Sequence, residues 1–283
     1  MKKIWGIMAA LCFVFVLAAC SSSEAEENND GDAEGNEEEV VEAESNDELT
    51  IYIVRHGKTM LNTTDRVQGW SDAVLTPAGE EIVTQAGIGL KDIDFQSAYS
   101  SDSGRAIQTA EIIMEENETS SELDLHTDER FREFNFGTYE GDLNETMWQD
   151  IADLQGITLE EFLENLEPEM FSNSVAELDE GRDEEGLNWP AEDYDAITAR
   201  LTEGLDELVE AEQGHEGSGN VLLVSHGLSI SALLDTYFDD YEVPEGGLDN
   251  ASVSVITYQN GEFQLDSVND MSYVEEGQKQ EEE

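Results

Sequence analysis

Residues 51–57, with the sequence IYIVRHG, decide the fold of this chain. The segment begins with four consecutive apolar or aromatic residues, rich in β-branched types, and this pattern predicts a buried strand. It ends in Arg55, His56 and Gly57. Ligands of open α/β sheets bind just beyond the carboxyl ends of the strands, where a glycine allows the backbone to approach a bound group closely. We therefore expect Arg55 to hold an oxyanion at this edge of the sheet and His56 to react with it.

Strands and helices alternate along the chain that follows this segment. Apolar runs predict the strands, and segments with apolar residues at helical spacing predict the helices, one of which starts at Thr76 and Pro77. Such alternation is typical of an α/β domain. We expect it to span residues 49–270 as a three-layer α/β/α sandwich around a mostly parallel mixed sheet. The predicted strands are residues 49–54, 95–100, 123–126, 221–224, 252–258 and 262–268.

Two acidic segments depart from this alternation. Residues 142–192 carry leucines and a phenylalanine at helical intervals, which predicts a helical cap inserted into the domain. Residues 271–283 are predicted to form an acidic tail that follows the domain.

The charge of the chain is extreme. Its 283 residues include 12 Lys and Arg against 68 Asp and Glu, and the formal net charge is −56. Such a surface repels nucleic acid and anionic membranes, so neither is an expected partner. A solvated acidic shell and a dedicated cation-binding role both fit this composition. Because both cysteines lie within the first 20 residues, we expect no disulfide, thiolate nucleophile or cysteine-ligated zinc in the folded part.

The N-terminus has the pattern of an export signal. Lys2 and Lys3 precede an apolar run over residues 4–19, which is short for a membrane span and predicts a signal peptide at residues 1–19. Residues 17–21, LAACS, resemble a bacterial lipobox. That resemblance implies that Cys20 becomes the lipidated first residue of an extracytoplasmic protein anchored to the cell membrane. An uncleaved anchor and an ordinary signal are the alternatives. Residues 20–48 have almost no apolar residues, so they are predicted to be a disordered acidic tether.

Basic residues are informative because they are so few. Arg55 ends the first strand, and Arg105 opens a helix just beyond the second. Arginine binds phosphate bidentately, and a helix start offers free N–H groups. His56 and His226 both follow apolar strands and precede glycine. We therefore expect an anion site with two imidazoles at the sheet edge. No histidine spacing typical of metal ligands is present, so metal binding is a weak interpretation.

Several motifs resemble those of the histidine phosphatase (phosphoglycerate mutase-like) superfamily. The sequence RHGKT at residues 55–59, followed by Asn62, resembles the RHGxTxxN signature. The other motifs occur in family order and extend over nearly the whole domain. They are Gln68–Gly69, the second arginine motif SSDSGRAIQTA at residues 100–110, the acid motif with Glu133 and FGTYEG at residues 136–141, and VSHG at residues 224–227.

The resemblance implies a mechanism. Neutral His56 would attack phosphorus and carry a phosphohistidine intermediate. Glu133 would protonate the leaving alkoxide and then help to activate water. No metal or organic cofactor would be required. The phosphate oxygens would be bound by Arg55, Asn62, Gln68, Gly69, Arg105 and His226.

The sequence favours hydrolysis over phosphate transfer between two positions of a sugar acid. Mutases of the family use additional basic residues beyond the acid motif, whereas Arg182 is the only basic residue among residues 137–189. An exported protein would also not meet glycolytic intermediates routinely. We therefore predict a metal-independent phosphomonoester hydrolase that acts on a small phosphorylated substrate. The alternatives are a phosphoglycerate mutase-type phosphotransferase and a catalytically silent anion-binding protein at the cell surface. The sequence leaves the oligomeric state open.

Overall fold

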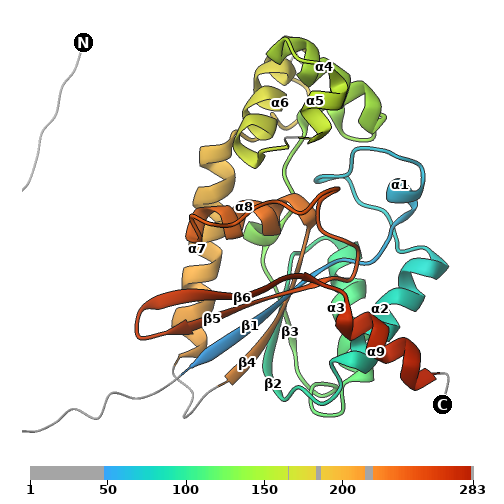
Figure 1. Cartoon of the computed structure of the whole chain (residues 1–283), viewed down its shortest axis with the longest axis vertical. Coiled ribbons are helices and arrows are strands. Elements are labelled where there is room, and N and C mark those ends of the chain that lie inside the picture. The colour runs from blue at the N-terminus through green and yellow to red at the C-terminus, as the bar shows by residue number, and fades with distance from the viewer. Residues whose placement is uncertain (1–47, 165, 183–185, 214–218, 282–283) are drawn as a thin grey trace, which may run out of the picture. The chain divides into compact units, whose positions relative to one another are not determined.

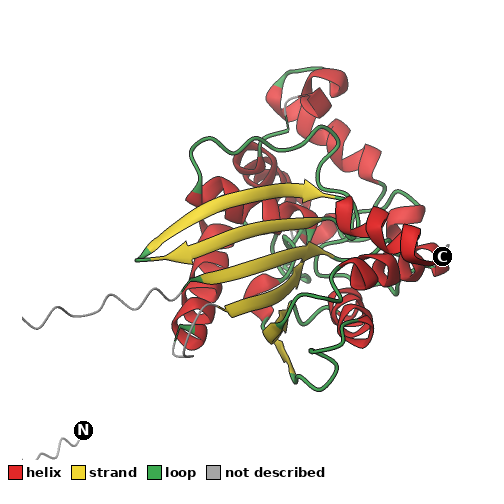
Figure 2. Cartoon of the chain, turned by 60° about the horizontal axis from the view of Figure 1, so that its bottom comes forward, coloured by secondary structure: helices red, strands yellow, loops and turns green. Residues whose placement is uncertain are grey.

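The central feature of the fold is a mixed β-sheet (Figures 1 and 2). The computed structural model describes residues 48–164, 166–182, 186–213 and 219–281. In this part of the chain six strands pair in the order β3-β2-β4-β1-β5-β6. The first four are mutually parallel, and the last two form an antiparallel hairpin. The strands are β1 (Leu49–Arg55), β2 (Phe95–Ser100), β3 (Leu125–Thr127), β4 (Gly219–Ser225), β5 (Val253–Gln259) and β6 (Glu262–Asp270).

The register of the parallel strands brings the two predicted histidines to one edge. Arg55 at the end of β1 pairs with Ser225 at the end of β4. His56 and His226 follow these residues directly, so both imidazoles leave the sheet at the same level. β2 runs parallel to β4 on its other side, and the helix that carries Arg105 begins four residues beyond β2.

Alternating side chains of the central strands divide the core into two layers. Leu49, Ile51 and Ile53 of β1 pack with α7 and α8 on one face of the sheet. Val54 of β1 and Val224 of β4 pack with α2, α3 and α9 on the other face. The expected three-layer α/β/α arrangement is confirmed. The helices of the two layers are α2 (Pro77–Gly89), α3 (Gly104–Glu116), α7 (Tyr194–Glu212), α8 (Gly227–Tyr237) and α9 (Ser272–Glu281).

The acidic insertion folds as three helices that lie together at the top of Figure 1. Phe162 and Phe171 stack with ring centroids 6.1 Å apart, and Phe171 meets Phe136 of the acid motif edge to face. The helical cap expected between residues 142 and 192 is therefore joined to the domain through the loop after Glu133. The helices are α4 (Asn144–Gln155), α5 (Leu159–Glu164) and α6 (Pro168–Arg182). The short elements α1 (Met60–Thr63), η1 (Glu129–Phe131) and η2 (Gly137–Tyr139) lie in loops.

The C-terminal segment differs from the predicted acidic tail. Residues Ser272–Glu281 form α9, which packs along α2. The two helices approach so closely that a Cβ atom on Gly277 would lie 1.9 Å from the carbonyl oxygen of Gln85. The segment is therefore part of the domain. The acidic composition did not reveal this, because the packing depends on glycines that let the two backbones come into contact.

The N-terminal predictions fall on residues that the structure leaves undescribed. The signal peptide, Cys20 and the tether up to residue 47 all belong to this region. Within the described part of the chain, no helix combines the length and apolarity that a membrane span requires.

Candidate active site

His56 lies at the end of β1 with its ring held in one tautomer. Its backbone N–H donates to Ser225 O at 3.0 Å, and its Nδ1 atom lies 2.8 Å from the carbonyl oxygen of Gly57. A carbonyl only accepts, so Nδ1 carries the proton and Nε2 keeps its lone pair. Gly57 must be glycine, because a Cβ atom there would lie 2.5 Å from Val83 and 2.9 Å from Gly79 O. The backbone thus presents Nε2 as a nucleophile.

Burial and the two arginines set the charge state of His56, whose ring lies next to that of His226. The His226 ring is buried, with its centroid 5.1 Å from that of His56. Burial, together with the positive charges of Arg105 and Arg55, lowers the pKa of His56 well below its ordinary value of 6.5. Burial and then Arg105 and His56 lower the pKa of His226 in the same way. Both imidazoles are therefore neutral at pH 7.

Arg105 is fully buried and is held by the loop after residue 68. Its Nη1 atom donates to Asp72 Oδ1 at 2.9 Å and to Ser71 O at 3.2 Å, and its Nη2 atom donates to Gly69 O at 2.8 Å. Burial lowers the pKa of Arg105, which the hydrogen bond and charge of Asp72 partly oppose. These contacts fix the guanidinium plane while its Nε atom is buried without a hydrogen-bond partner.

Arg55 is the last residue of β1 and directly precedes His56. Its Nη1 atom donates to the carbonyl oxygen of Leu248, and its guanidinium packs against Gly227, where a Cβ atom would lie 3.2 Å from Nε. Its Nε atom is also buried without a partner. Glu133 raises the pKa of both Arg55 and Arg105 through its charge, against the lowering effect of burial. The carboxylate of Glu133 therefore belongs to the same cluster.

Glu133 is positioned by the start of α8. Its carboxylate accepts hydrogen bonds from the backbone N–H groups of Phe134, Leu228 and Ser229 at 2.9–3.1 Å, and from the hydroxyl of Ser229 at 3.0 Å. These donors fix the orientation of the carboxylate. Glu133 is therefore held near the two arginines, where it can exchange a proton with a reacting group.

Three further predicted binding residues shape the loop that faces the site. The amide oxygen of Asn62 accepts from the backbone of Thr59 at 3.1 Å as part of the capping box of α1. Gln68 Oε1 lies 2.5 Å from Thr59 Oγ1, while Gln68 Nε2 is buried without a partner. Gly69 contacts Arg105 through its carbonyl oxygen and leaves no room for a side chain. Direct contacts from these three residues to phosphate stay predictions.

Glu140 and Arg200 are two residues of the site that the sequence analysis did not identify. Glu140 accepts from the backbone N–H groups of Gly69, Trp70 and Ser71 at 2.8–3.1 Å, and so shapes the loop that holds Arg105. The signal for Glu140 was present, since it lies inside the acid motif FGTYEG.

Arg200, on α7, forms hydrogen bonds with the backbone around Glu133. Its side chain donates to the carbonyl oxygens of Arg132 at 2.7 Å and Glu133 at 3.0 Å, and it binds both carboxylate oxygens of Glu192 at 2.7 and 2.9 Å. Glu192 in turn accepts from the backbone N–H of Asn135 at 2.9 Å. The scarcity of basic residues was the available signal for Arg200.

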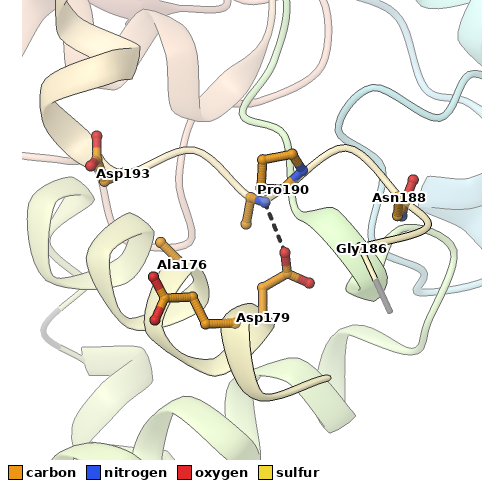
Figure 3. Close-up of a pocket in the computed structure, with 8 residues that line it drawn as sticks. Ala176, Asp179, Gly186, Asn188, Pro190 and Asp193 are labelled. Carbon is orange, nitrogen blue, oxygen red and sulfur yellow. Dashed lines mark hydrogen bonds between the residues drawn. The ribbon is translucent and has the colours of Figure 1, made fainter. Parts of the chain in front are cut away.

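A pocket of about 540 Å³ is lined by residues of α6 and of the segment before α7 (Figure 3). None of the predicted site residues lines it. Asp179 faces the pocket, but its carboxylate accepts from the backbone N–H groups of Thr138 at 2.7 Å and Ala191 at 2.9 Å. We therefore interpret this pocket as a structural gap where α6 packs against the segment before α7. Within the described residues, no group of three or more His, Cys, Asp or Glu could hold a metal ion.

The arrangement suits a tetrahedral oxyanion. Buried nitrogen atoms without partners are present on Arg55 and Arg105, whose charges act on His56, and on His226, whose ring centroid lies 5.1 Å from that of His56. Unsatisfied buried donors are costly unless a ligand uses them. A phosphoryl group bound to these donors would present its phosphorus to the His56 nucleophile.

Known proteins share this organisation. The model of the histidine phosphatase superfamily (branch 1) matches residues 51–271. The chain is 32% identical over 213 residues to the Escherichia coli O1:K1 protein named "Probable phosphoglycerate mutase GpmB", a match that covers 75% of this chain and 86% of that protein. The crystal structure of phosphoglycerate mutase from Bacillus anthracis is similar at a TM-score of 0.75 and 39% identity, covering 83% of this chain and 98% of that one. Mycobacterial glucosyl-3-phosphoglycerate phosphatase, in a structure with VO3, is similar at a TM-score of 0.57 and 25% identity, covering 78% and 98%.

Proposed function

Because the chain belongs to the histidine phosphatase superfamily (branch 1), we propose that it hydrolyses phosphomonoesters without a metal, through a phosphohistidine on His56. The family acts on small phosphorylated substrates. The observation that carries the proposal is the set of buried, unpartnered nitrogen atoms of Arg55, Arg105 and His226 around a neutral His56. They supply both a binding site for phosphate oxygens and a nucleophile for phosphorus.

The first chemical step transfers the phosphoryl group to His56. Nε2 of His56 attacks phosphorus, the ester P–O bond breaks, and Glu133 gives a proton to the departing alkoxide. Arg55 and Arg105 stabilise the charge that develops on the equatorial oxygens. Glu133 enters this step protonated and leaves it as a carboxylate.

The second step regenerates the enzyme. Glu133, now a carboxylate, takes a proton from a water molecule while the water oxygen attacks the phosphorus of phosphohistidine. The P–N bond breaks, and inorganic phosphate leaves with His56 restored to its neutral form. The hydrogen bonds from the backbone N–H groups of Leu228 and Ser229 orient the Glu133 carboxylate for this step.

The pairing of basic residues favours a hydrolase over a mutase. Arg132, Arg182 and Arg200 are each engaged by a carboxylate, from Asp102, Asp142 and Glu192 respectively. These arginines are already neutralised and offer little to a second anionic group of a substrate. Phosphoglycerate mutase activity is the second candidate, favoured by the name of the Bacillus anthracis relative.

Hydrolysis of phenyl phosphate by the full-length chain, with a chelator present, tests the proposal. Turnover should persist in the chelator and disappear in His56→Ala, while Glu133→Gln should slow it by about 10²–10⁴-fold. Arg182→Gln, in the cap, serves as the control and should keep normal turnover. Turnover that survives in His56→Ala would contradict the proposal. Conversion of 3-phosphoglycerate faster than hydrolysis would favour the mutase.

We also propose that Cys20 carries a lipid that anchors the protein at the extracytoplasmic side of the cell membrane. The lipobox-like sequence LAACS at residues 17–21 supports this proposal. Two acyl chains would suffice for stable anchoring. Metabolic labelling with a fatty acid should mark the wild-type protein, and Cys20→Ser should lose both the label and the membrane association. A labelled Cys20→Ser protein would contradict the proposal.

A further inference from the structure

Two tryptophans lie together beside the backbone of Glu133. The rings of Trp70 and Trp189 have centroids 5.9 Å apart and are tilted by 50°. Trp189 is 70% exposed, which is unusual for so large an apolar side chain. The two residues come from separate segments, the loop after Gln68 and the segment before α7, so their contact is formed only in the folded protein.

Trp70 is tied to both functional halves of the site. Its indole Nε1–H donates to the backbone oxygen of Glu133 at 3.1 Å. Its chain neighbours Gly69 and Ser71 bind Arg105 through their carbonyl oxygens. The ring therefore lies between the arginine that binds phosphate and the acid that protonates the leaving group. Trp70 is thus hydrogen-bonded to the residue that is proposed to protonate the leaving group.

The charges around Trp70 indicate which leaving groups fit. The guanidinium of Arg132 lies over the Trp70 ring, 4.8 Å from its centroid, so Arg132 and its partner set the charge on this side of the ring. Arg132 is itself bound by Asp102 at 2.5 Å, so it offers no free charge to a carboxylate. The surrounding net charge of −56 repels further anionic groups. An uncharged, flat, apolar group satisfies these conditions.

We propose that Trp70 and Trp189 form a binding surface for the leaving group and make the enzyme selective for phosphomonoesters of uncharged aromatic alcohols. This inference rests on the proposed hydrolase function. Aromatic rings stack offset or edge to face, and a tilted pair with one ring largely exposed can receive a third ring. The surface binds the part of the substrate that Arg55, Arg105 and His226 do not contact.

Three substrates with the same kind of departing oxygen test the proposal. Benzyl phosphate, cyclohexylmethyl phosphate and glycerol 1-phosphate are all primary alkyl esters, so they differ mainly in the group that meets the tryptophans. The full-length enzyme should have the highest kcat/KM for benzyl phosphate, through a lower KM. Trp189→Leu should reduce the preference for benzyl over cyclohexylmethyl phosphate by about two- to tenfold. Trp189→Phe should keep most of it.

The control is Leu163→Ala, which removes an exposed apolar side chain from α5 of the cap and should leave the preference unchanged. Equal kcat/KM for benzyl and cyclohexylmethyl phosphate, or a preference that survives Trp189→Leu, would overturn the inference while hydrolysis stands. If no ester is hydrolysed, the proposed function fails instead. Calorimetric titration of His56→Ala with the same two esters then decides the inference, since tighter binding of benzyl phosphate that depends on Trp189 supports it and equal binding overturns it.

Discussion

His56 is made a nucleophile by its immediate surroundings. The hydrogen bond from Nδ1 to the carbonyl oxygen of Gly57 leaves Nε2 unprotonated, and burial with Arg105 and Arg55 keeps the ring neutral. The acidic surface of the whole protein acts in the opposite direction, because negative charge favours an imidazolium. Local burial and the arginines determine the outcome, since they act at contact distance and the surface is screened by water and salt.

The depressed histidine pKa values predict unusual titration behaviour. The ring signals of His56 and His226 in NMR spectra should remain those of neutral imidazole as the pH is lowered through 6.5. Because the unfolded chain takes up these protons near pH 6.5 and the folded chain does not, the free energy of unfolding should fall as the pH drops below that value. Signals are assigned with His56→Gln and His226→Gln. A midpoint at or above pH 6.5 for either ring would contradict the burial argument.

Arg200 is predicted to act as a positioning residue for Glu133. Arg200→Lys replaces a planar fork with a single ammonium, which cannot bind the Arg132 and Glu133 carbonyl oxygens and both oxygens of Glu192 together. We expect kcat to fall by about tenfold, the equivalent of roughly one hydrogen bond. The fall should grow as the leaving alcohol becomes less acidic, because poor leaving groups depend most on the proton from Glu133.

Arg182→Lys is the matched control for this prediction. Arg182 makes its ion pairs with Asp142 and Asp150 at the cap, so kcat should be unchanged across the same esters. An Arg200→Lys enzyme that loses the same factor with every leaving group would show that Arg200 supports folding without orienting the acid.

The sequence predicted the site best where local patterns determine position. His56, Arg55 and His226 follow apolar strands directly, and Arg105 opens a helix, so the strand ends alone bring them together. Glu140 and Arg200 were missed because they act by bonding to backbone atoms of loops distant in sequence. Asn62 was predicted to bind phosphate, and in the structure its amide oxygen closes the capping box of α1.

At the scale of elements, a glycine-to-alanine substitution should have opposite effects inside and outside the contact between α9 and α2. Gly277→Ala places a Cβ atom against the backbone of Gln85 and should lower the free energy of unfolding by about 1–3 kcal/mol. Gly181→Ala, near the end of α6, meets no atom within 4 Å and should raise it by about 0.5–1 kcal/mol. Urea denaturation measures both values. Equal changes in the two variants would mean that α9 does not stabilise the domain.

The missed helix shows where sequence patterns stop. α2 was predicted because its start is marked locally by Thr76 and Pro77, and the structure confirms that Thr76 accepts from Gly79 N at 3.0 Å. α9 has an acidic sequence with few apolar residues, among them buried Val274. Its position depends on two close backbone contacts, Gly277 with Gln85 and Gly89 with Tyr273, and each joins residues that are far apart in the sequence. No local pattern encodes such a contact.

At the scale of the whole molecule, the net charge of −56 should slow the encounter with an anionic substrate. The screening length shortens from ~30 Å at 0.01 M salt to ~10 Å at 0.1 M. We therefore expect kcat/KM for phenyl phosphate to rise by roughly two- to tenfold over this range, while kcat changes less. Initial-rate assays over a series of sodium chloride concentrations measure kcat/KM and kcat. A steady fall, with circular dichroism unchanged, would contradict the prediction.

The central claim is that the phosphoryl group is carried by His56. Rapid acid-free quenching during turnover of phenyl phosphate, followed by mass spectrometry of the peptide that contains residues 51–57, measures this most directly. The account predicts a phosphoryl group on His56 that is stable in alkali, lost in acid, and absent from His56→Ala. It should accumulate in Glu133→Gln with an activated aryl ester, because the base for the second step is missing. A phosphoryl group on another residue would contradict the mechanism. So would turnover without any phosphorylated peptide in both the wild-type enzyme and Glu133→Gln.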